Sequence, residues 1–569
     1  MGRQGRREDR LCAQRFALTM NRFRNFELYW NTVRYLRPAQ VHGRIRRHLV
    51  RSPPDLAAPP RLRPFNSEAW VRPAEREPSL EGPRRFSFLN EAHDIAARRW
   101  DGATDDKLWS YNLNYFDDLN ARNASARREW HLALLEDWVS ETCPGQGVCW
   151  EPYPTSLRIV NWIKWALGGN PLPDACVASL AIQARWITKN LETHLLGNHL
   201  FANAKALVFA GLFFHGGEAD SWLELGLSLL AREVPEQILA DGAQFELSPM
   251  YHSLALEDML DLINVTRAYG GRFATKWTSA IEDWPLVAGR MRDWLLHMCH
   301  PDGGIAFFND AAIGIAPSPA EIEDYARRLG LGSRPKPGPG IRHLEGSGYV
   351  RLTKGSMVAL LDVARVGPDY LPGHAHADTL SFELSLGGQR VLVNSGTSCY
   401  GVSDERLRQR GTDAHNTVVV NGKDSSEVWS GFRVARRARP FGIQVLSDPM
   451  SVSCSHDGYR RLAGRPVHRR SWTVFEESLS VQDHVIGRDH GSVAYFHFHP
   501  DIQPEALATA KLGRARLRDG RIFTWQVFQG EARLEPTTWH PRFGESVPTT
   551  RLAVALHGGR SAITFNCGS

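Results

Sequence analysis

The sequence predicts a protein of two unlike parts, with helical hairpins stacked into a toroid or solenoid followed by an antiparallel β-sandwich. Between about residues 94 and 330, apolar residues recur at the i, i+3, i+4 spacing of amphipathic helices. Beyond residue 346 the pattern changes to short stretches rich in β-branched and aromatic residues, with Gly, Asp and Asn between them. Proline and glycine fill the run SRPKPGPG at 333–340, which is typical of a linker.

These changes in pattern divide the chain into four segments. An N-terminal helical and extended segment covers residues 1–90, and the helical domain covers 91–332. A linker follows at 333–343, and the β-sandwich occupies 344–569. The length of 569 residues agrees with this division, because ~150 residues per domain predicts roughly two to four domains.

The composition is that of a soluble globular protein. Hydrophobic residues make up 42% and charged residues 23%, which excludes disordered, collagen-like and disulfide-scaffold chains. The net charge of +6 is too small over this length to indicate nucleic-acid binding. Arginine far outnumbers lysine, and its planar guanidinium suits carboxylate or sulfate ligands. Codon bias in a G+C-rich genome is the simpler explanation of the same excess.

Cysteine usage and apolar runs bear on the compartment. The eight cysteines are scattered and form no CxxC pair, which argues against a disulfide framework or a cysteine-rich zinc site. Cys143 and Cys149 are near enough for a local bridge, although we expect free thiols. No apolar run approaches the ~18 residues of a membrane span. The basic N-terminus lacks a clear signal peptide, so we expect cytoplasmic location by default. Periplasmic or secreted location stays open, as does a start at Met20.

The first 330 residues are predominantly helical. The segment Asn21–Val50 is expected to be helical amid arginines, and Ser52–Pro83 to be extended because it is rich in proline and charge. Gly and Pro separate the later helices and indicate short links between them. The periodicity predicts helices over Trp130–Val139, Ser156–Leu167, Cys176–His194, Asn198–Phe214, Ser221–Leu239, Leu254–Tyr269 and Trp277–His300.

The last 220 residues or so contain about twelve predicted strands. Their number, shortness and turn-rich connections indicate an antiparallel sandwich. The strands are expected at Tyr349–Leu352, Met357–Val363, Leu380–Leu386, Val391–Val393, Thr417–Val420, Gly442–Leu446, Ser471–Phe475, Ser480–Asp483, Val493–Phe498, Phe523–Phe528, Arg551–Leu556 and Ala562–Phe565.

Two polar clusters lie at predicted helix starts. The first is the run GNHL, where Asn198 is also a good helix N-cap, so that a structural role competes with a functional one. His199 makes the same position unusually polar. The second is SPMYH, which places Tyr251 and His252 at the mouth of the next helix. A tyrosine at the start of a helix more often has a packing role than a catalytic one.

A third cluster is the run HAHAD at 374–378. If 379–386 is a strand, alternation sends His374, His376 and Asp378 to the same side. Imidazoles arranged in this way bind a metal or act in catalysis. Asn394 ends the next predicted strand and His415 opens another, so these side chains are candidates to converge on one divalent ion.

Taken together, the motifs resemble the heparinase II/III family of polysaccharide lyases, which is related to the oligoalginate lyases. The resemblance covers roughly residues 100–440 well and the remainder loosely, and it rests on the order and spacing of several motifs. The family fold is an incomplete α/α toroid followed by an antiparallel β-sandwich. The matching runs are WEPYPTSLR at 150–158, GNHL at 197–200, SPMYH at 248–252, DGG at 302–304, HAHAD at 374–378 and AHNTV at 414–418.

The resemblance implies β-elimination on a uronic-acid polysaccharide, giving an unsaturated uronate. This chemistry requires a donor that stabilises the substrate carboxylate, a base for the C5 proton and an acid for the O4 leaving group. By motif, Asn198 resembles the carboxylate-binding residue and Tyr251 the acid that protonates O4. His374 resembles the imidazole that serves as base or neutraliser, and His199 is a second candidate for the base. The site is expected in the cleft between the two domains.

The resemblance also raises the question of a metal. Some family members hold a structural zinc, and the matching positions are His376, Asn394 and His415. The family commonly has Asp where this chain has Asn394, and an amide is a weaker zinc ligand than a carboxylate. We expect no required cofactor and substoichiometric zinc, with the histidines hydrogen-bonded to Asn394 as the alternative.

Four arginines are candidates to bind substrate carboxylate or sulfate. Arg406, Arg410 and Arg433 flank the site motifs in the sandwich half, and Arg158 belongs to a toroid motif. For any one of them, a surface salt bridge is the competing interpretation. The partner expected is an acidic polysaccharide, with neither nucleic acid nor an integral membrane segment involved. The particular polysaccharide, endo or exo action and the oligomeric state stay open.

Two other functions compete with a lyase. A glycoside hydrolase on an α/α scaffold needs two carboxyl groups flanking the scissile bond, for which Glu246, Glu257, Asp258 and Asp310 are available. None of the four stands out as a paired acid and base. A non-catalytic glycan-binding protein of exopolysaccharide biosynthesis is the other alternative, with the arginine-rich helix near the N-terminus as a docking segment.

Overall fold

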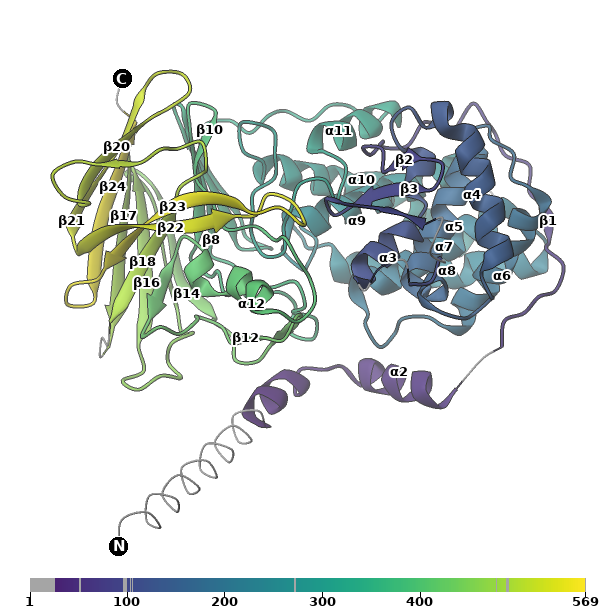
Figure 1. Ribbon diagram of the computed structural model, residues 1–569, viewed down its shortest axis with the longest axis horizontal. Coiled ribbons are helices and arrows are strands. Elements are labelled where there is room, and N and C mark those ends of the chain that lie inside the picture. The colour runs from purple at the N-terminus through teal and green to yellow at the C-terminus, as the bar shows by residue number, and fades with distance from the viewer. Residues whose placement is uncertain are drawn as a thin grey trace, which may run out of the picture.

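The computed structural model places a helical half beside a β-rich half, with an N-terminal arm along one side of both (Figure 1). The sequence prediction of a toroid followed by a sandwich is confirmed in this arrangement. The predicted helix before residue 26 and the alternative start at Met20 lie outside the described residues. The structure describes residues 26–567, apart from 51–52, 96–99, 103, 105, 271–272, 477 and 488–490.

The helical half consists of antiparallel hairpins in the predicted order. Periodicity located each long helix to within a few residues. The exceptions are the end of α6, which stops at Lys189, short of the predicted His194, and the start of α9, which lies at Pro249, ahead of the predicted Leu254. The helices are α3 (Lys107–Leu113), α4 (Arg128–Glu141), α5 (Pro152–Leu167), α6 (Asp174–Lys189), α7 (Gly197–Phe213), α8 (Gly217–Gln237), α9 (Pro249–Tyr269), α10 (Thr275–His297) and α11 (Pro319–Arg328).

Helix α9 begins where its sequence dictates. Ser248 occupies the N-cap, and its hydroxyl accepts a hydrogen bond from the backbone N–H of Tyr251 at 3.2 Å. Pro249 takes the first helical position, where a missing N–H costs nothing. The run SPMY therefore fixes the catalytic candidate Tyr251 in the first turn of the helix.

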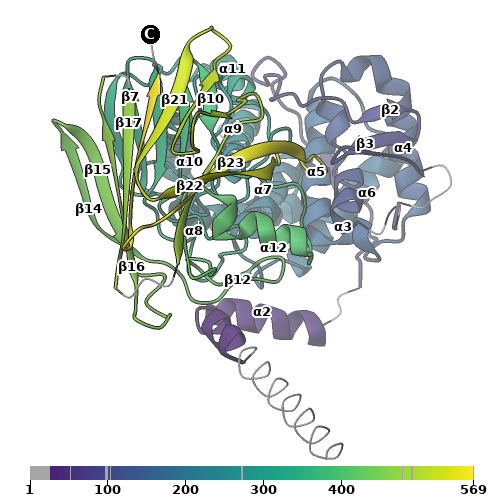
Figure 2. The same ribbon diagram turned by 60° about the vertical axis from the view of Figure 1, so that its left-hand side comes forward.

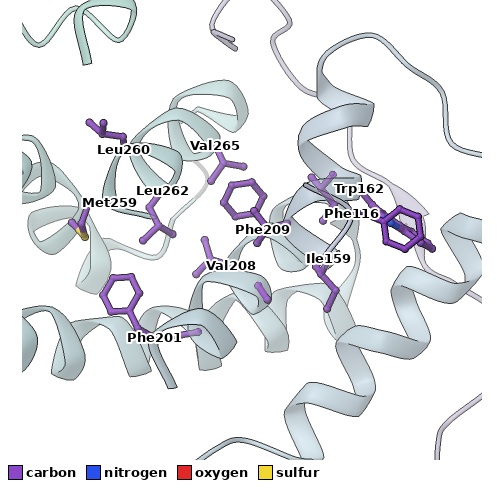
Figure 3. Close-up of a cluster of buried hydrophobic side chains, with 14 of the residues drawn as sticks. Phe116, Ile159, Trp162, Phe201, Val208, Phe209, Met259, Leu260, Leu262 and Val265 are labelled. Carbon is purple, nitrogen blue, oxygen red and sulfur yellow. The ribbon is translucent and has the colours of Figure 1, made fainter. Parts of the chain in front are cut away.

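Apolar faces of the helices meet in one continuous core (Figure 3). The faces of α7 and α9 are packed together there, with Val208 and Phe209 near Leu262 and Val265. The core extends toward the outer helices through Trp162, which contacts Phe116 edge to face at 5.5 Å between ring centroids. Tryptophan in this half is largely core, as expected.

The β-rich half is built from three antiparallel sheets. A five-stranded sheet has the order β10-β9-β8-β7-β6, a four-stranded sheet β11-β18-β23-β22, and an eight-stranded sheet β14-β15-β16-β17-β24-β21-β20-β19. Their inward faces share a second apolar core. The strands are β6 (Gly340–Leu344), β7 (Tyr349–Lys354), β8 (Met357–Asp362), β9 (Phe382–Leu386), β10 (Gln389–Leu392), β11 (Val418–Val420), β14 (Pro440–Ser447), β15 (Met450–His456), β16 (Val467–Val474), β17 (Ser478–Ile486), β18 (Ser492–His497), β19 (Glu505–Ala506), β20 (Leu512–Arg516), β21 (Ile522–Gln529), β22 (Glu531–Trp539), β23 (Val547–Ala555) and β24 (Arg560–Cys567).

Apolar residues from both halves form the joint between them. Trp294 of α10 and Phe308 from the following loop pack with Tyr349 of β7 and Leu360 of β8. The first strand, β6, begins inside the expected linker at Gly340. The sequence did not indicate β15, β20 or β22, whose side chains lack a clear alternation of apolar and polar residues.

The N-terminal arm comprises a helix at 26–33 and helix α2 (Pro38–Leu49). It runs beneath the body in both views (Figures 1 and 2). Beyond it the chain is largely extended, as expected, and strand β1 (Arg61–Leu62) pairs with β5 (Phe214–His215) at the end of α7. Strands β2 (Leu80–Gly82), β3 (Arg85–Phe88) and β4 (Glu91–Asp94) then form a small sheet.

Two expectations about the whole chain bear on its environment. None of the helices that the structure describes between residues 26 and 567 combines the length and the apolar character needed to cross a bilayer. Cys143 is exposed and Cys149 buried, and both thiols are free, so the local bridge does not form.

Candidate active site between the two halves

Aromatic side chains from both halves meet at the domain boundary. The ring of Tyr251, at the start of α9, stacks on the imidazole of His374 with 3.8 Å between centroids. The phenol oxygen of Tyr251 lies 2.9 Å from that of Tyr400, which belongs to the loop after β10. Tyr400 in turn contacts the ring of Phe432 edge to face at 5.1 Å. Two of the predicted catalytic residues, Tyr251 and His374, are thus brought together.

The carboxylate of Asp310 organises the sandwich side of this site. Its Oδ2 lies 2.9 Å from Nδ1 of His374, and its Oδ1 lies 2.8 Å from Nε2 of His376. The guanidinium of Arg406, on helix α12 (Asp404–Arg410), donates to both oxygens. Thr397 donates a further hydrogen bond at 3.3 Å. The positive guanidinium and the hydrogen bonds from the two imidazoles hold the pKa of Asp310 well below its usual range, so the carboxylate stays ionised.

An ionised Asp310 determines where His374 carries its proton. Because Nδ1–H donates to the carboxylate, Nε2 keeps its lone pair and is the atom able to accept a proton. This Nε2 lies 3.6 Å from Oε2 of Glu246. Burial raises the pKa of Glu246, and Oε2 has no hydrogen-bond partner among the described residues. The site therefore combines an imidazole able to accept a proton with a buried carboxyl group whose pKa is raised.

The toroid contributes Asn198 and His199 from the first turn of α7. Gly197 begins this helix at φ +55°, and a Cβ there would lie 2.3 Å from the side chain of Leu371. Glycine is required at that position because the two halves approach each other so closely. Asn198 follows directly and is half-exposed.

His199 is held in place from two sides. Its Nδ1 lies 3.0 Å from Oε1 of Glu192, and its ring packs against that of Tyr153 at a tilt of 39°, with 4.4 Å between centroids. Hydrogen bonds from His199 and from the amide of Asn203 lower the pKa of Glu192, which therefore stays ionised. An ionised partner at Nδ1 leaves Nε2 of His199 as the free nitrogen, so this second candidate for the base has a suitable tautomer.

The backbone around HAHAD differs from the expectation. Strand β9 begins at Phe382, so residues 374–378 lie in the loop that precedes it. Between this run and the strand, Leu380 adopts φ +64°. The alternation of side chains along a strand therefore does not determine the directions of His374, His376 and Asp378. His374 and His376 still converge on Asp310, but Asp378 turns away and accepts a hydrogen bond from the backbone N–H of Asn309.

The positions that match a zinc site form a hydrogen-bonded group. Nδ1 of His376 lies 3.2 Å from Nε2 of His415, and burial lowers the pKa of both imidazoles, so both are neutral. Since Nε2–H of His376 donates to Asp310, the bond between the histidines runs from His415 to His376. Oδ1 of Asn394 accepts from the backbone of Asn416 at 3.1 Å, so the alternative of histidines bonded to this amide is not found.

These donors do not make a complete metal site. Across the described residues, no group of three or more His, Cys, Asp or Glu side chains is arranged to hold a metal ion. Two nitrogen atoms do remain without partners among the described residues, Nδ1 of His415 and Nδ2 of Asn394. An amide nitrogen does not ligate zinc, and the carboxylate that would complete a tetrahedral set is absent from position 394. The described side chains at these positions thus provide two imidazoles and an amide, short of the four ligands of a structural zinc site.

Arg158 is a structural residue, contrary to its expected contact with substrate. Its side chain is fully buried in the toroid and lies over the ring of Trp138 at 3.9 Å. Burial lowers its pKa to about 9. Its guanidinium donates to Gln183, Thr155 and the backbone oxygens of Asn114 and Cys149.

Two further arginines are also unavailable to a ligand. Arg406 is fully buried against Asp310, and Arg410 is fully buried with its guanidinium on the backbone oxygens of Ala375 and Gly431. Both hold the sandwich loops in place, so the expected substrate contacts are wrong for them. Arg433 is exposed, as expected of a ligand-binding arginine.

Four residues of the site escaped the sequence interpretation as lyase residues. Tyr400 and Glu192 belong to no matched motif, and the sequence offers Glu246 and Asp310 only as carboxyl groups for hydrolysis. One available signal was the run FFND at 307–310, a polar pair directly after buried aromatic residues. Nothing in the sequence connects Tyr400 to Tyr251, which lie 149 positions apart.

Comparison with known proteins agrees with this architecture. The chain matches the family described as "Heparinase II/III N-terminus" over residues 125–326 and "Heparinase II/III-like, C-terminal" over residues 336–567. A heparin-sulfate lyase of Bacteroides stercoris is 28% identical over 325 residues, which is 52% of this chain and 45% of that protein. A heparin-sulfate lyase of Pedobacter heparinus is 25% identical over 364 residues, or 58% and 51% of the two chains. The chain thus spans about half the length of these relatives.

Solved structures show the same fold. A crystal structure of heparinase III superposes with a TM-score of 0.63 at 17% identity, covering 81% of this chain and 77% of that one. A heparan sulfate lyase mutant from Pedobacter heparinus gives 0.58 at 18% identity, with 85% and 81% covered. Since the two family matches together span both halves of the molecule, the chain belongs to the heparinase II/III-like family.

Proposed function

We propose that this protein is a polysaccharide lyase that cleaves a uronic-acid-containing acidic polysaccharide by β-elimination. The observation that carries the proposal is the stacking of Tyr251 on His374 across the domain boundary, with a proton-accepting nitrogen on one ring and a phenol on the other. Membership of the family and the names of its relatives as heparin-sulfate lyases support the same activity.

Each group has a role in the elimination. Asn198 donates its amide hydrogens to the substrate carboxylate, and Glu246, whose pKa is raised by burial, can add a second neutral donor when its carboxyl group is protonated. These contacts stabilise the charge that develops when C5 loses its proton. Nε2 of His374 takes that proton, with Asp310 stabilising the imidazolium that results. His199 is the alternative base for a substrate of the opposite C5 configuration.

Tyr251 completes the reaction. As the bond between C4 and the glycosidic oxygen breaks, the C4–C5 double bond forms and the phenol gives its proton to the leaving oxygen. The pKa of Tyr251 is well above its usual value because of burial and the neighbouring Tyr400, so the phenol carries a proton to give at neutral pH. The proton on His374 can then return to the adjacent Tyr251, which restores the starting state.

The carboxyl groups argue against hydrolysis. Hydrolysis needs two free carboxyl groups on either side of the glycosidic bond. Asp310 is fully buried with its oxygens bonded to Arg406 and two imidazoles, and Glu257 and Asp258 form ion pairs inside the toroid. Glu246 is then left without a second carboxyl group to act with it.

The test is ultraviolet absorbance of the C4–C5 double bond during incubation with a panel of uronic-acid polysaccharides. The panel contains heparan-like, hyaluronan-like, alginate-like and bacterial capsular glycans. We expect absorbance to rise with at least one member and Tyr251→Phe to abolish the rise. The matched control is Tyr495→Phe, which removes a phenol from β18 in the sandwich. New reducing ends without absorbance would overturn the proposal, as would full activity of Tyr251→Phe.

A further inference from the structure

The N-terminal arm presents apolar side chains to solvent instead of to the body. In α2, Val41, Ile45 and Leu49 are 46%, 53% and 78% exposed. Their spacing of four residues places them in one stripe along the helix. In the preceding helix at 26–33, Phe26 and Trp30 have the same spacing and are 67% and 57% exposed. Each helix of the arm therefore carries an apolar stripe that nothing in the described part of the chain covers.

The opposite side of each helix is fixed to the protein. Gln40 donates a hydrogen bond to the backbone oxygen of Tyr370 at 3.2 Å, and Gly43 lies against the backbone of His194 so closely that a Cβ would be 2.8 Å from its nitrogen. In the first helix, the hydroxyl of Thr32 accepts from the indole of Trp429 at 3.1 Å. The outward direction of the apolar stripes is thus set by specific contacts on the other face.

The charges beside the stripes are positive. Residues 26–50 contain five arginines against one glutamate. Arg44 and Arg46 each lie about 100° around α2 from Ile45, one on either side of the stripe. Both are exposed. An apolar face with tryptophan and phenylalanine, bordered by arginine, is the pattern of helices that lie in the interface of an anionic bilayer.

From this arrangement we propose that the arm docks the protein on an anionic lipid surface, with the two apolar stripes inserted among the acyl chains. A second copy of the chain is the competing occupant. A symmetric contact between two arms would bring their arginines together, and like charges at such a contact oppose it. An anionic bilayer pairs the same arginines with lipid headgroups, so the charge of the arm favours the lipid.

The test is co-sedimentation of the full-length protein with vesicles of phosphatidylcholine alone or mixed with phosphatidylglycerol. We expect binding to the mixed vesicles that weakens with added salt and is absent with phosphatidylcholine alone. Ile45→Glu and Leu49→Glu should each weaken the partitioning about tenfold, the effect of losing one buried aliphatic side chain. Both sites are exposed, so the melting temperature should stay unchanged.

A matched control separates docking from a change of net charge. Phe528, on β21 of the sandwich, is 64% exposed and distant in sequence from the arm. Phe528→Glu adds the same negative charge and should leave vesicle binding intact. Absence of binding by the wild type would overturn the proposal, as would equal binding by Ile45→Glu or to phosphatidylcholine alone. A wild-type dimer that Ile45→Glu converts to a monomer would assign the stripes to a second copy instead.

Discussion

Oδ2 of Asp310 lies 2.9 Å from Nδ1 of His374, and this contact sets the tautomer of the imidazole at the domain boundary. Asp310 belongs to the loop after α10, whereas His374 precedes β9, so the two residues come from opposite sides of the linker. The base of the proposed reaction is therefore oriented by a residue of the other half of the molecule.

Replacing this carboxylate tests its positioning role. Asp310→Asn leaves one acceptor oxygen where the two imidazoles need two, and it leaves the guanidinium of Arg406 buried without its counter-ion. We expect a loss of turnover of about 10²- to 10⁴-fold, the usual contribution of a positioned general base. The free energy of unfolding should fall by about 3–5 kcal/mol, because one partner of a buried ion pair is lost. Kinetics of double-bond formation and denaturant unfolding measure the two effects.

The sandwich offers a matched control for that variant. Asp483 is also a buried carboxylate, bonded to Arg470 and to His468 at 2.7 Å each, but it lies in the eight-stranded sheet. Asp483→Asn should lower stability by a similar amount and leave turnover near the wild-type value. Equal losses of turnover in both variants would show that Asp310 acts only through stability.

Tyr400→Phe tests the contact between the two phenols. The change removes the hydrogen bond that holds the Tyr251 hydroxyl, and one such bond is worth about 1 kcal/mol. We expect kcat to fall about fivefold with little change in KM, because orientation of the acid is affected and substrate binding is not. The control Tyr459→Phe removes a phenol bonded to the backbone of Val418 in the sandwich. An unchanged kcat in Tyr400→Phe would remove this residue from the site.

Zinc content is expected to stay well below one ion per chain. His376 and His415 are hydrogen-bonded to each other, and Asn394 supplies no negative charge. Elemental analysis of the purified protein measures this directly. The Asn394→Asp variant restores a carboxylate and should raise the zinc content. One zinc per wild-type chain would contradict the expectation.

A buried histidine predicts a loss of stability in acid. His252 accepts from the backbone N–H of Gln244 at 3.1 Å and contacts the backbone oxygen of Met291 at 2.9 Å, and burial lowers its pKa to about 3. Between the ordinary pKa of 6.5 and about 3, the unfolded chain binds a proton that the folded chain does not, so stability falls as pH falls.

The size of this effect is about 1.4 kcal/mol for each pH unit within that window. In His252→Gln the free energy of unfolding should depend less steeply on pH. The slope should decrease by up to the amount that one bound proton contributes, about 1.4 kcal/mol per pH unit. Denaturant unfolding at several pH values measures the slope. The control His557→Gln changes an exposed histidine and should keep the wild-type slope. An equal slope in His252→Gln would show that other groups dominate.

Much of the fold could be predicted because local patterns determine it. The apolar period located α5 and α7 to within a few residues. Helix α9 begins at Pro249, ahead of the predicted Leu254, because Ser248 caps it and Pro249 takes its first position. The strand expected from Thr379 exists but begins later, at Phe382, because Leu380 takes a left-handed backbone conformation that alternation of side chains does not reveal.

The candidate site was predicted only in part, for a different physical reason. Tyr251 and His374 belong to recognisable motifs, whereas Asp310 acquires its partners from segments 64 to 96 residues away. Sequence spacing carries no signal over such separations. The substrate contact predicted for Arg158 was wrong for the opposite reason. Its motif matched, but its role depends on its burial, which follows only from how the helices pack around it.

The carboxylate of Asp310, which comes from the helical half, binds His374, His376 and Arg406 of the sandwich half, so the contact between the halves and the proposed chemistry depend on the same few atoms. Separating the halves by heat or denaturant removes the orientation of His374 at the same moment. Residual activity in a partly unfolded sample is therefore proportional to the fraction of molecules whose two halves are still packed together. An assay of product also measures domain association.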